Sequence, residues 1–120
     1  MGVNLILIAF GGSLGAIGRF LMANAIKNWS TSSFPKATLF INALGSMLLG
    51  LLIGNGSGED TMFFLGVGFC GSFTTFSTFN WETLKLLQDN LKWGLIYFFG
   101  SYIIGLGFGV AGYMIGLVFK

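Results

Sequence analysis

The sequence predicts an all-α membrane protein with four transmembrane helices, the third of which is broken. The 120 residues are 54% hydrophobic and only 8% charged, whereas soluble domains carry about 25% charged residues. Four apolar stretches of the length that one membrane crossing needs, about 20 residues, fill nearly the whole chain. The third stretch contains a run of glycines and hydroxyl residues that a continuous helix tolerates poorly.

These stretches leave room for a single transmembrane domain, residues 1–120, and for no soluble domain. We expect its spans at about residues 3–26, 37–54, 61–88 and 93–119. A polar loop at 27–36, the turn-rich sequence NGSGED at 55–60 and a short turn at 89–92 would connect them. Glycine supplies 20 of the 120 residues, more than twice the usual ~7%, which favours closely packed membrane helices.

The third span is organised around residues 66–81, GVGFCGSFTTFSTFNW, in which three glycines are followed by five hydroxyl residues. In a membrane, irregular backbone persists only where protein or a water-filled cavity satisfies its polar groups. We therefore expect a broken helix, whose second half begins near residues 75–78 with hydroxyls available as N-caps. Phe76 and Phe79 would lie on one face of that second half.

Span one carries a single ionisable residue, Arg19, together with Gly11 and Gly15 in GxxxG spacing. Such spacing lets helix backbones approach closely. A charge inside a membrane costs about 2.5–3.5 kcal/mol on insertion scales. Arg19 therefore either extends toward the membrane surface near Lys27 or supplies a cation at a pore mouth or a subunit interface.

Spans two and four contain isolated polar side chains. Asn42 lies near the middle of span two and needs partners there, so it either bonds to another helix or lines a pore. Ser46 and Gly50 add a face of small residues to the same span. Span four carries Tyr97 and Ser101 on one face, and beyond them lie two GxxxG pairs, Gly105/Gly109 and Gly112/Gly116.

The distribution of lysine predicts an orientation, because positively charged loops tend to remain in the cytoplasm. The side of the membrane that holds both chain ends carries one lysine, Lys120, beside Glu59 and Asp60. The opposite side carries Lys27, Lys36, Lys85 and Lys92. This asymmetry predicts that both termini lie outside.

The polar side chains that the chain contains limit the functions it can have. The chain has no histidine, its one cysteine, Cys70, suits a small buried apolar position, and no carboxylate precedes Glu82 within the spans. No enzyme or thiol metal cluster is therefore expected, and a proton-coupled exchanger would lack its titrating group. Neutral donors and polarised ring edges favour an anion, whereas carbonyls freed around residues 71–75 favour a cation such as sodium. The glycine-rich faces favour self-association.

Three segments of the chain resemble the Fluc (CrcB-type) fluoride channel family: GGSLGAIGRF at 11–20, TLFINALGSMLLG at 38–50 and GFCGSFTTFSTF at 68–79. The resemblance covers nearly the whole chain. It implies a passive, highly selective channel in the cell membrane of a bacterium, which exports toxic fluoride from the cytoplasm. It also implies an antiparallel dual-topology homodimer with two pores and a central sodium ion.

The resemblance extends to individual residues. Phe76 and Phe79 match the pair whose ring edges line the fluoride path, and Asn42 matches the asparagine that helps coordinate the ion. Gly71 and Thr74 match the positions whose backbone carbonyls, from both subunits, hold the sodium ion. The hydroxyls that line the rest of the path and the arginine near its vestibule correspond to Ser77, Thr78, Tyr97, Ser101 and Arg19.

Two features depart from the family's pattern. Gly105 stands where the family's path has a further hydroxyl. The lysine asymmetry also exceeds what equal insertion in both directions suggests, which leaves open a heterodimer with an oppositely biased partner.

Two other classes of protein remain alternatives. A small four-span multidrug or cation exporter would need an acidic residue in span one, where this chain has Arg19. A non-transporting assembly subunit would use the same polar groups only for helix packing, and it would not conduct on its own.

Overall fold

The computed structural model describes residues 2–29 and 35–120, and almost all of them are helical. The helices are α1 (Gly2–Trp29), α2 (Lys36–Gly54), α3 (Glu59–Thr61), the π-helix η1 (Met62–Cys70), α4 (Gly71–Phe73), α5 (Ser77–Asp89) and α6 (Leu91–Val118). Four helical stretches are long and apolar enough to cross a membrane: Gly2–Lys27, Lys36–Gly54, Glu59–Asp89 and Leu91–Val118. The expectation of an all-helical chain with four such stretches is therefore confirmed.

Two connections are shorter than the sequence predicts. The expected loop at 27–36 is helical as far as Trp29, and its residues 30–34 lie outside the described part of the chain. The expected turn at 89–92 is reduced to one extended residue, Asn90. The amide of Asn90 donates to the Leu86 carbonyl, and its side chain accepts from the amide of Lys92 at 3.1 Å. One asparagine thus ends α5 and caps α6, because an N-cap side chain satisfies an amide that the helix leaves unpaired.

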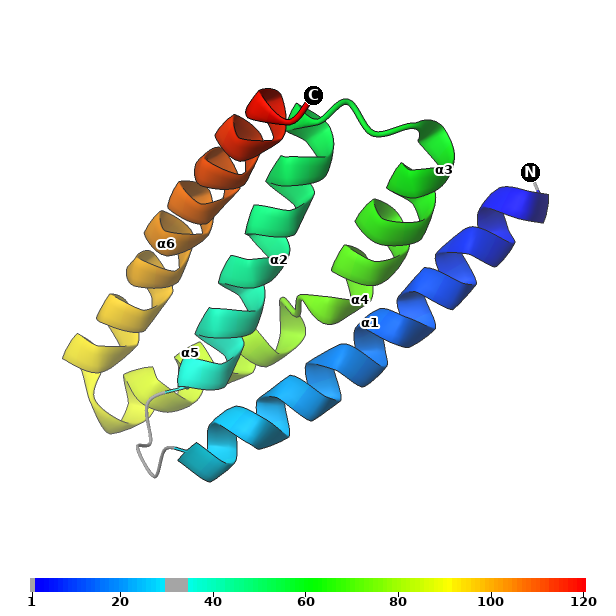
Figure 1. Ribbon diagram of the computed structural model, residues 1–120. Coiled ribbons are helices and arrows are strands. Elements are labelled where there is room, and N and C mark those ends of the chain that lie inside the picture. Colours follow the sequence, from blue (N-terminus) through cyan, green and yellow to red (C-terminus); the bar gives the residue numbers. More distant parts are fainter. Residues whose placement is uncertain (1, 30–34) are drawn as a thin grey trace.

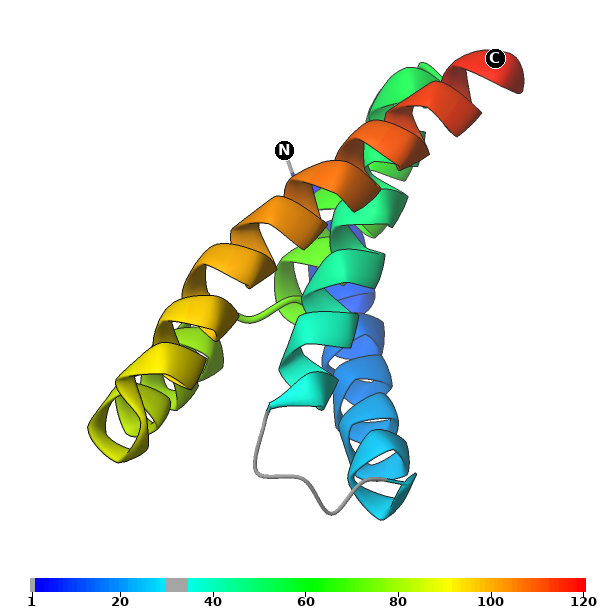
Figure 2. The same cartoon turned by 90° about the vertical axis from the view of Figure 1, so that its left-hand side faces the viewer.

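The helices pack as two pairs (Figure 1). α2 and α6 run in the same direction along each other, and α1 lies along η1 and α4. Both chain ends and the connection between α2 and α3 lie at one end of the molecule, while the turn between α5 and α6 lies at the other. Figure 2 shows that α6 crosses α2 at an angle rather than lying parallel to it.

Glycines let the backbones of α2 and α6 touch. A β-carbon at Gly50 would overlap the Gly109 carbonyl, and one at Gly112 would overlap the Met47 carbonyl. Similar contacts recur one turn further on, between Gly54 and Tyr113. The predicted role of the glycine series in close packing is therefore confirmed for Gly112, whose pair with Gly116 has the spacing typical of membrane helices.

Glycines also let the backbone of α1 touch the third apolar stretch, Glu59–Asp89. A β-carbon at Gly11 would overlap the Phe64 carbonyl, and one at Gly15 would overlap the Ser72 hydroxyl. Ser72 donates from its Oγ to the Gly12 carbonyl at 2.6 Å. This contact surface is formed largely by η1, whose nine residues form an unusually long π-helix, since most π-helices are single turns.

The outer surfaces of α1 and α6 are apolar. Val3, Phe10, Phe20, Ile103 and Val118 are each more than half exposed. Side chains as buried as Ile41 and Tyr97, with exposed fractions of 2% and 1%, are few in the described chain. Such a surface would associate in water, whereas in a bilayer it contacts lipid chains.

We predict that Gly112→Ala destabilises the protein by about 1–3 kcal/mol, because the added methyl group forces α2 and α6 apart. Gly107→Ala is the matched control, since nothing lies within 4 Å of a β-carbon there. Its thermal midpoint in detergent should equal or exceed the wild-type value, because alanine favours helix. Equal midpoints for the two variants would contradict the close packing of α2 and α6.

Candidate functional site

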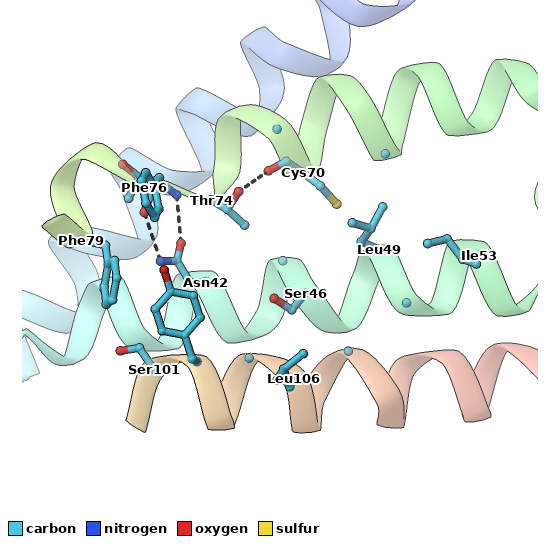
Figure 3. A pocket seen from close by; sticks show the side chains of 18 of the residues that line it. Asn42, Ser46, Leu49, Ile53, Cys70, Thr74, Phe76, Phe79, Ser101 and Leu106 are labelled. Atoms are coloured by element: carbon cyan, nitrogen blue, oxygen red, sulfur yellow. Dashed lines mark hydrogen bonds between the residues drawn. The ribbon is translucent and has the colours of Figure 1, made fainter. Parts of the chain in front are cut away.

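A large open cavity of about 920 Å³ lies between the two helix pairs. Its walls come from α2, η1, the start of α4, the segment 74–76, the start of α5 and the middle of α6. Most of the lining is apolar. The polar side chains that line it are Asn42, Ser46, Thr74, Thr75, Ser101, Tyr102 and Tyr113. Figure 3 shows Asn42, Phe76, Phe79 and Ser101 gathered at one end of this cavity.

The end of the site that holds Asn42 and Phe76 is built on a non-helical segment. α4 ends at Phe73, Thr74–Phe76 belong to no helix, and α5 begins at Ser77. Thr74 has the extended backbone angles φ −77° and ψ 158°. This segment leaves backbone amides and carbonyls without their helical partners, and in an apolar medium those groups need substitutes.

Asn42 supplies two of these substitutes. Its Nδ2 donates to the Thr75 carbonyl at 3.1 Å, and its Oδ1 accepts from the Thr75 amide at 2.9 Å (Figure 3). The carboxamide thus pairs with the backbone of Thr75 as a neighbouring peptide unit would. Asn42 thus bonds to another part of the chain, as one of the two interpretations expects, and it also lines the cavity.

The hydroxyl of Thr75 satisfies a further group. Its Oγ1 accepts from the Thr78 amide at 3.3 Å, although Phe76, not a hydroxyl residue, occupies the N-cap position of α5. The expected hydroxyl cap therefore exists, but it acts from one residue before the N-cap.

These substitutions free two carbonyls. In a continuous helix the amides of Thr75 and Thr78 would donate to the carbonyls of Gly71 and Thr74. Here those amides donate to Asn42 and to the Thr75 hydroxyl instead. Gly71 and Thr74 both line the cavity. Gly71 is exposed, and nothing lies within 4 Å of a β-carbon built on it.

The two phenylalanines of the motif have different surroundings. Phe79 is 4% exposed and packs against Tyr97, Phe98 and Tyr102, with ring centroids 5.2, 5.8 and 5.8 Å away. Phe76 is 64% exposed, and its ring centroid lies 6.2 Å from that of Phe79. Phe76 precedes α5 instead of lying on its face, yet both rings line the cavity.

The expected hydroxyl residues are only partly brought together. Ser101 lines the cavity, and its Oγ is buried without a hydrogen-bond partner in the described chain. Tyr97 lies behind the Phe79 ring, where its hydroxyl donates to Glu82 Oε1 at 3.4 Å. Ser77 and Thr78 are exposed at the start of α5, outside the cavity lining.

Arg19 also lies away from this cavity, partly exposed on α1. The structure thus brings Asn42, Gly71, Thr74, Phe76, Phe79 and Ser101 together around one cavity, with Tyr97 in contact with Phe79.

Sequence reasoning missed several polar residues of the lining, and Ser46 and Tyr102 are among them. Ser46 was interpreted as part of a small-residue face. Its position four residues after Asn42, which places both on one side of α2, was the available signal. Tyr102 directly follows Ser101, and no spacing in the sequence separates it from the aromatic residues that face lipid.

Four apolar helical stretches around an open, mostly apolar cavity define a small multi-pass membrane protein. The chain belongs to the family of CrcB-like proteins (camphor resistance, CrcB), whose family model matches residues 6–113. That membership confirms the resemblance noted in the sequence.

Curated relatives cover nearly the full chain. A protein of Bacillus cereus named fluoride-specific ion channel FluC 2 is 44% identical over 115 residues, which cover 95% of this chain and 98% of that protein. A protein of Thermus thermophilus named fluoride-specific ion channel FluC is 43% identical over 117 residues, or 92% and 93% of the two chains. A protein of Listeria monocytogenes named fluoride-specific ion channel FluC 1 is 40% identical over 116 residues, or 96% and 98%.

We predict that Asn42→Ala destabilises the protein by about 1–3 kcal/mol, since it leaves the amide and carbonyl of Thr75 unpaired. Thermal unfolding in detergent measures the effect. Asn80→Ala is the control, because the Asn80 side chain is exposed. A variant at position 42 as stable as the control would show that the pairing with Thr75 contributes nothing.

Proposed function

We propose that this protein is a passive, highly selective fluoride channel. The observation that carries the proposal is the lining of the cavity. Among the described residues, no acidic or basic side chain lines it, while amide and hydroxyl groups and two phenylalanine rings do. Proton-coupled transporters use intramembrane carboxylates, so this lining supports conduction without coupling. The names of the relatives, fluoride-specific ion channels, indicate that the conducted ion is fluoride.

The polar groups of the cavity suit an anion. Thr75 occupies one of the two amide hydrogens of Asn42 and one of the two lone pairs of its oxygen, so the second amide hydrogen is free to donate. The buried hydroxyl of Ser101 has no partner in the described chain. Aromatic rings carry positive charge at their edges, and the exposed ring of Phe76 supplies such an edge. A small, strongly hydrated anion needs donors of this kind to replace its water.

The proposed channel has a broken third transmembrane helix and is a dimer. The helical segments on either side of 74–76 are the two halves of one broken transmembrane helix. Two copies of the single transmembrane domain 1–120 assemble as an antiparallel dual-topology homodimer with two pores. The open cavity and the exposed position of Gly71 support this assembly, because a second copy would cover both.

A sodium ion at the centre of the dimer would be held by the carbonyls of Gly71 and Thr74 from both copies. The donor set fits the ion, since sodium prefers uncharged oxygen ligands of the kind that unwound membrane helices provide, and both carbonyls lack their helical amide. Among the described residues, no cluster of histidine, cysteine and carboxylate groups offers another cation site. The ion would fix the two copies in register.

Passive conduction implies that the fluoride gradient sets the direction of flow. A bacterium whose cytoplasm has accumulated fluoride would therefore lose it through the protein, which relieves toxicity. The experiment that tests the function is efflux of fluoride from liposomes that contain only the purified protein, with chloride as the control ion. Rapid loss of fluoride with retention of chloride is expected. A folded but silent preparation would favour a non-transporting subunit.

We predict that Phe76→Ile reduces fluoride efflux at least about tenfold, because a loss of about 1.4 kcal/mol at the barrier has this effect. The substitution removes the polarised ring edge and keeps an apolar side chain. Phe10→Ile is the matched control, since Phe10 is also 64% exposed but lies on α1 outside the cavity. Wild-type efflux in the variant at position 76 would refute a role for this ring.

We also predict that Gly71→Val prevents dimer assembly while the single chain still folds, because a β-carbon at Gly71 meets nothing within 4 Å in the single chain. Gel filtration in detergent measures the assembly. Gly107→Val is the control, since its position is equally open but lies on α6 away from the cavity. If both variants elute as dimers, Gly71 does not lie at the dimer centre.

A further inference from the structure

We infer that Ser46 is an anion-binding residue of this cavity, and that its hydroxyl forms a second fluoride subsite one helical turn beyond Asn42. The inference rests on the proposed fluoride conduction and deepens it. Nothing in the sequence pattern had assigned Ser46 a function other than helix packing.

The geometry of two facing helices carries the argument. α2 places Asn42 and Ser46 four residues apart, and α6 places Ser101 and Gly105 four apart, so each pair lies on one face of its helix. All four residues line the cavity. Ser46 Oγ lies 3.7 Å from the position that a β-carbon of Gly105 would occupy. Figure 3 shows the Ser46 side chain directed from α2 toward α6.

The hydrogen-bonding state of Ser46 distinguishes it from other hydroxyl residues of the chain. Ser13, Thr74 and Thr83 each donate to the carbonyl four residues earlier, at 2.8 Å in every case. This local bond is the usual way in which a helical hydroxyl is satisfied in an apolar medium. In the described part of the chain, no hydrogen bond involves Ser46 Oγ, and none involves Ser101 Oγ.

An unpaired hydroxyl in an apolar surrounding is costly unless a ligand accepts its hydrogen. The two unpaired hydroxyls line the same cavity from α2 and α6, Ser101 at the end that holds Asn42 and Ser46 one helical turn further along α2. Because Gly105 has no side chain, α6 offers no hydrogen-bond donor from the position opposite Ser46 and leaves that part of the cavity open. Ser46 is therefore the donor at this level, and the ion passes from Asn42 and Ser101 to Ser46.

The experiment compares fluoride efflux from liposomes for four proteins besides the wild type. Ser46→Ala should conduct about five- to tenfold more slowly, because one hydrogen bond to an anion is lost. The double variant S46A/G105S returns a hydroxyl from the opposite wall and should recover efflux to within about twofold of the wild type. S46A/G105A fills the same space without a hydroxyl and should stay slow. Ser13→Ala, which removes a hydroxyl satisfied within α1, should conduct normally.

Each variant is expected to fold, because a β-carbon at Gly105 would make only ordinary contact with its neighbours. Elution as the wild-type species and an unchanged thermal midpoint check this. Wild-type efflux in S46A, rescue by G105A as effective as rescue by G105S, or no rescue by G105S would each overturn the role of Ser46. A silent wild-type protein would instead refute the proposed function, and the subsite with it.

Discussion

The pairing of the Asn42 carboxamide with the backbone of Thr75 is the interaction on which the site depends. A membrane offers no water to a backbone that leaves its helix, so the segment 74–76 persists only because side chains replace its lost partners. Asn42 replaces them from α2, and the Thr75 hydroxyl replaces another from within the segment. The same exchange frees the carbonyls of Gly71 and Thr74 and fixes Asn42 at the cavity wall.

The two glycine-packed helix pairs hold this segment in place. Direct backbone contact between α2 and α6 positions Asn42 and Ser101 on facing walls, and α1 packs against both η1 and α4, which precede the segment 74–76. Between the pairs the chain does not fill its own interior, and the cavity results. The glycines therefore let the helices pack closely within each pair, while the space between the two pairs stays open as the cavity.

The sequence predicted the four helical stretches because long apolar runs have few other solutions, and the motif at 66–81 indicated where irregular backbone lies. It could not predict which side chain satisfies Thr75, since that partner lies 33 residues away. It placed Phe76 and Phe79 in equivalent positions, whereas three rings of α6 bury only Phe79. Ser46 was missed because a serine among small residues gives the same sequence pattern whether its side chain packs against another helix or binds an anion.

The unequal burial of the two phenylalanines has a consequence for preorganisation. Phe79 is held by its aromatic neighbours as soon as the single chain folds, so no rotamer entropy remains to be lost there when an ion arrives. Phe76 is 64% exposed, so far fewer contacts restrict its rotamers in the single chain. In the proposed dimer, folding of the single chain would thus fix the ring of Phe79 beside the ion path. The ring of Phe76 would become rigid only when the other copy covers it.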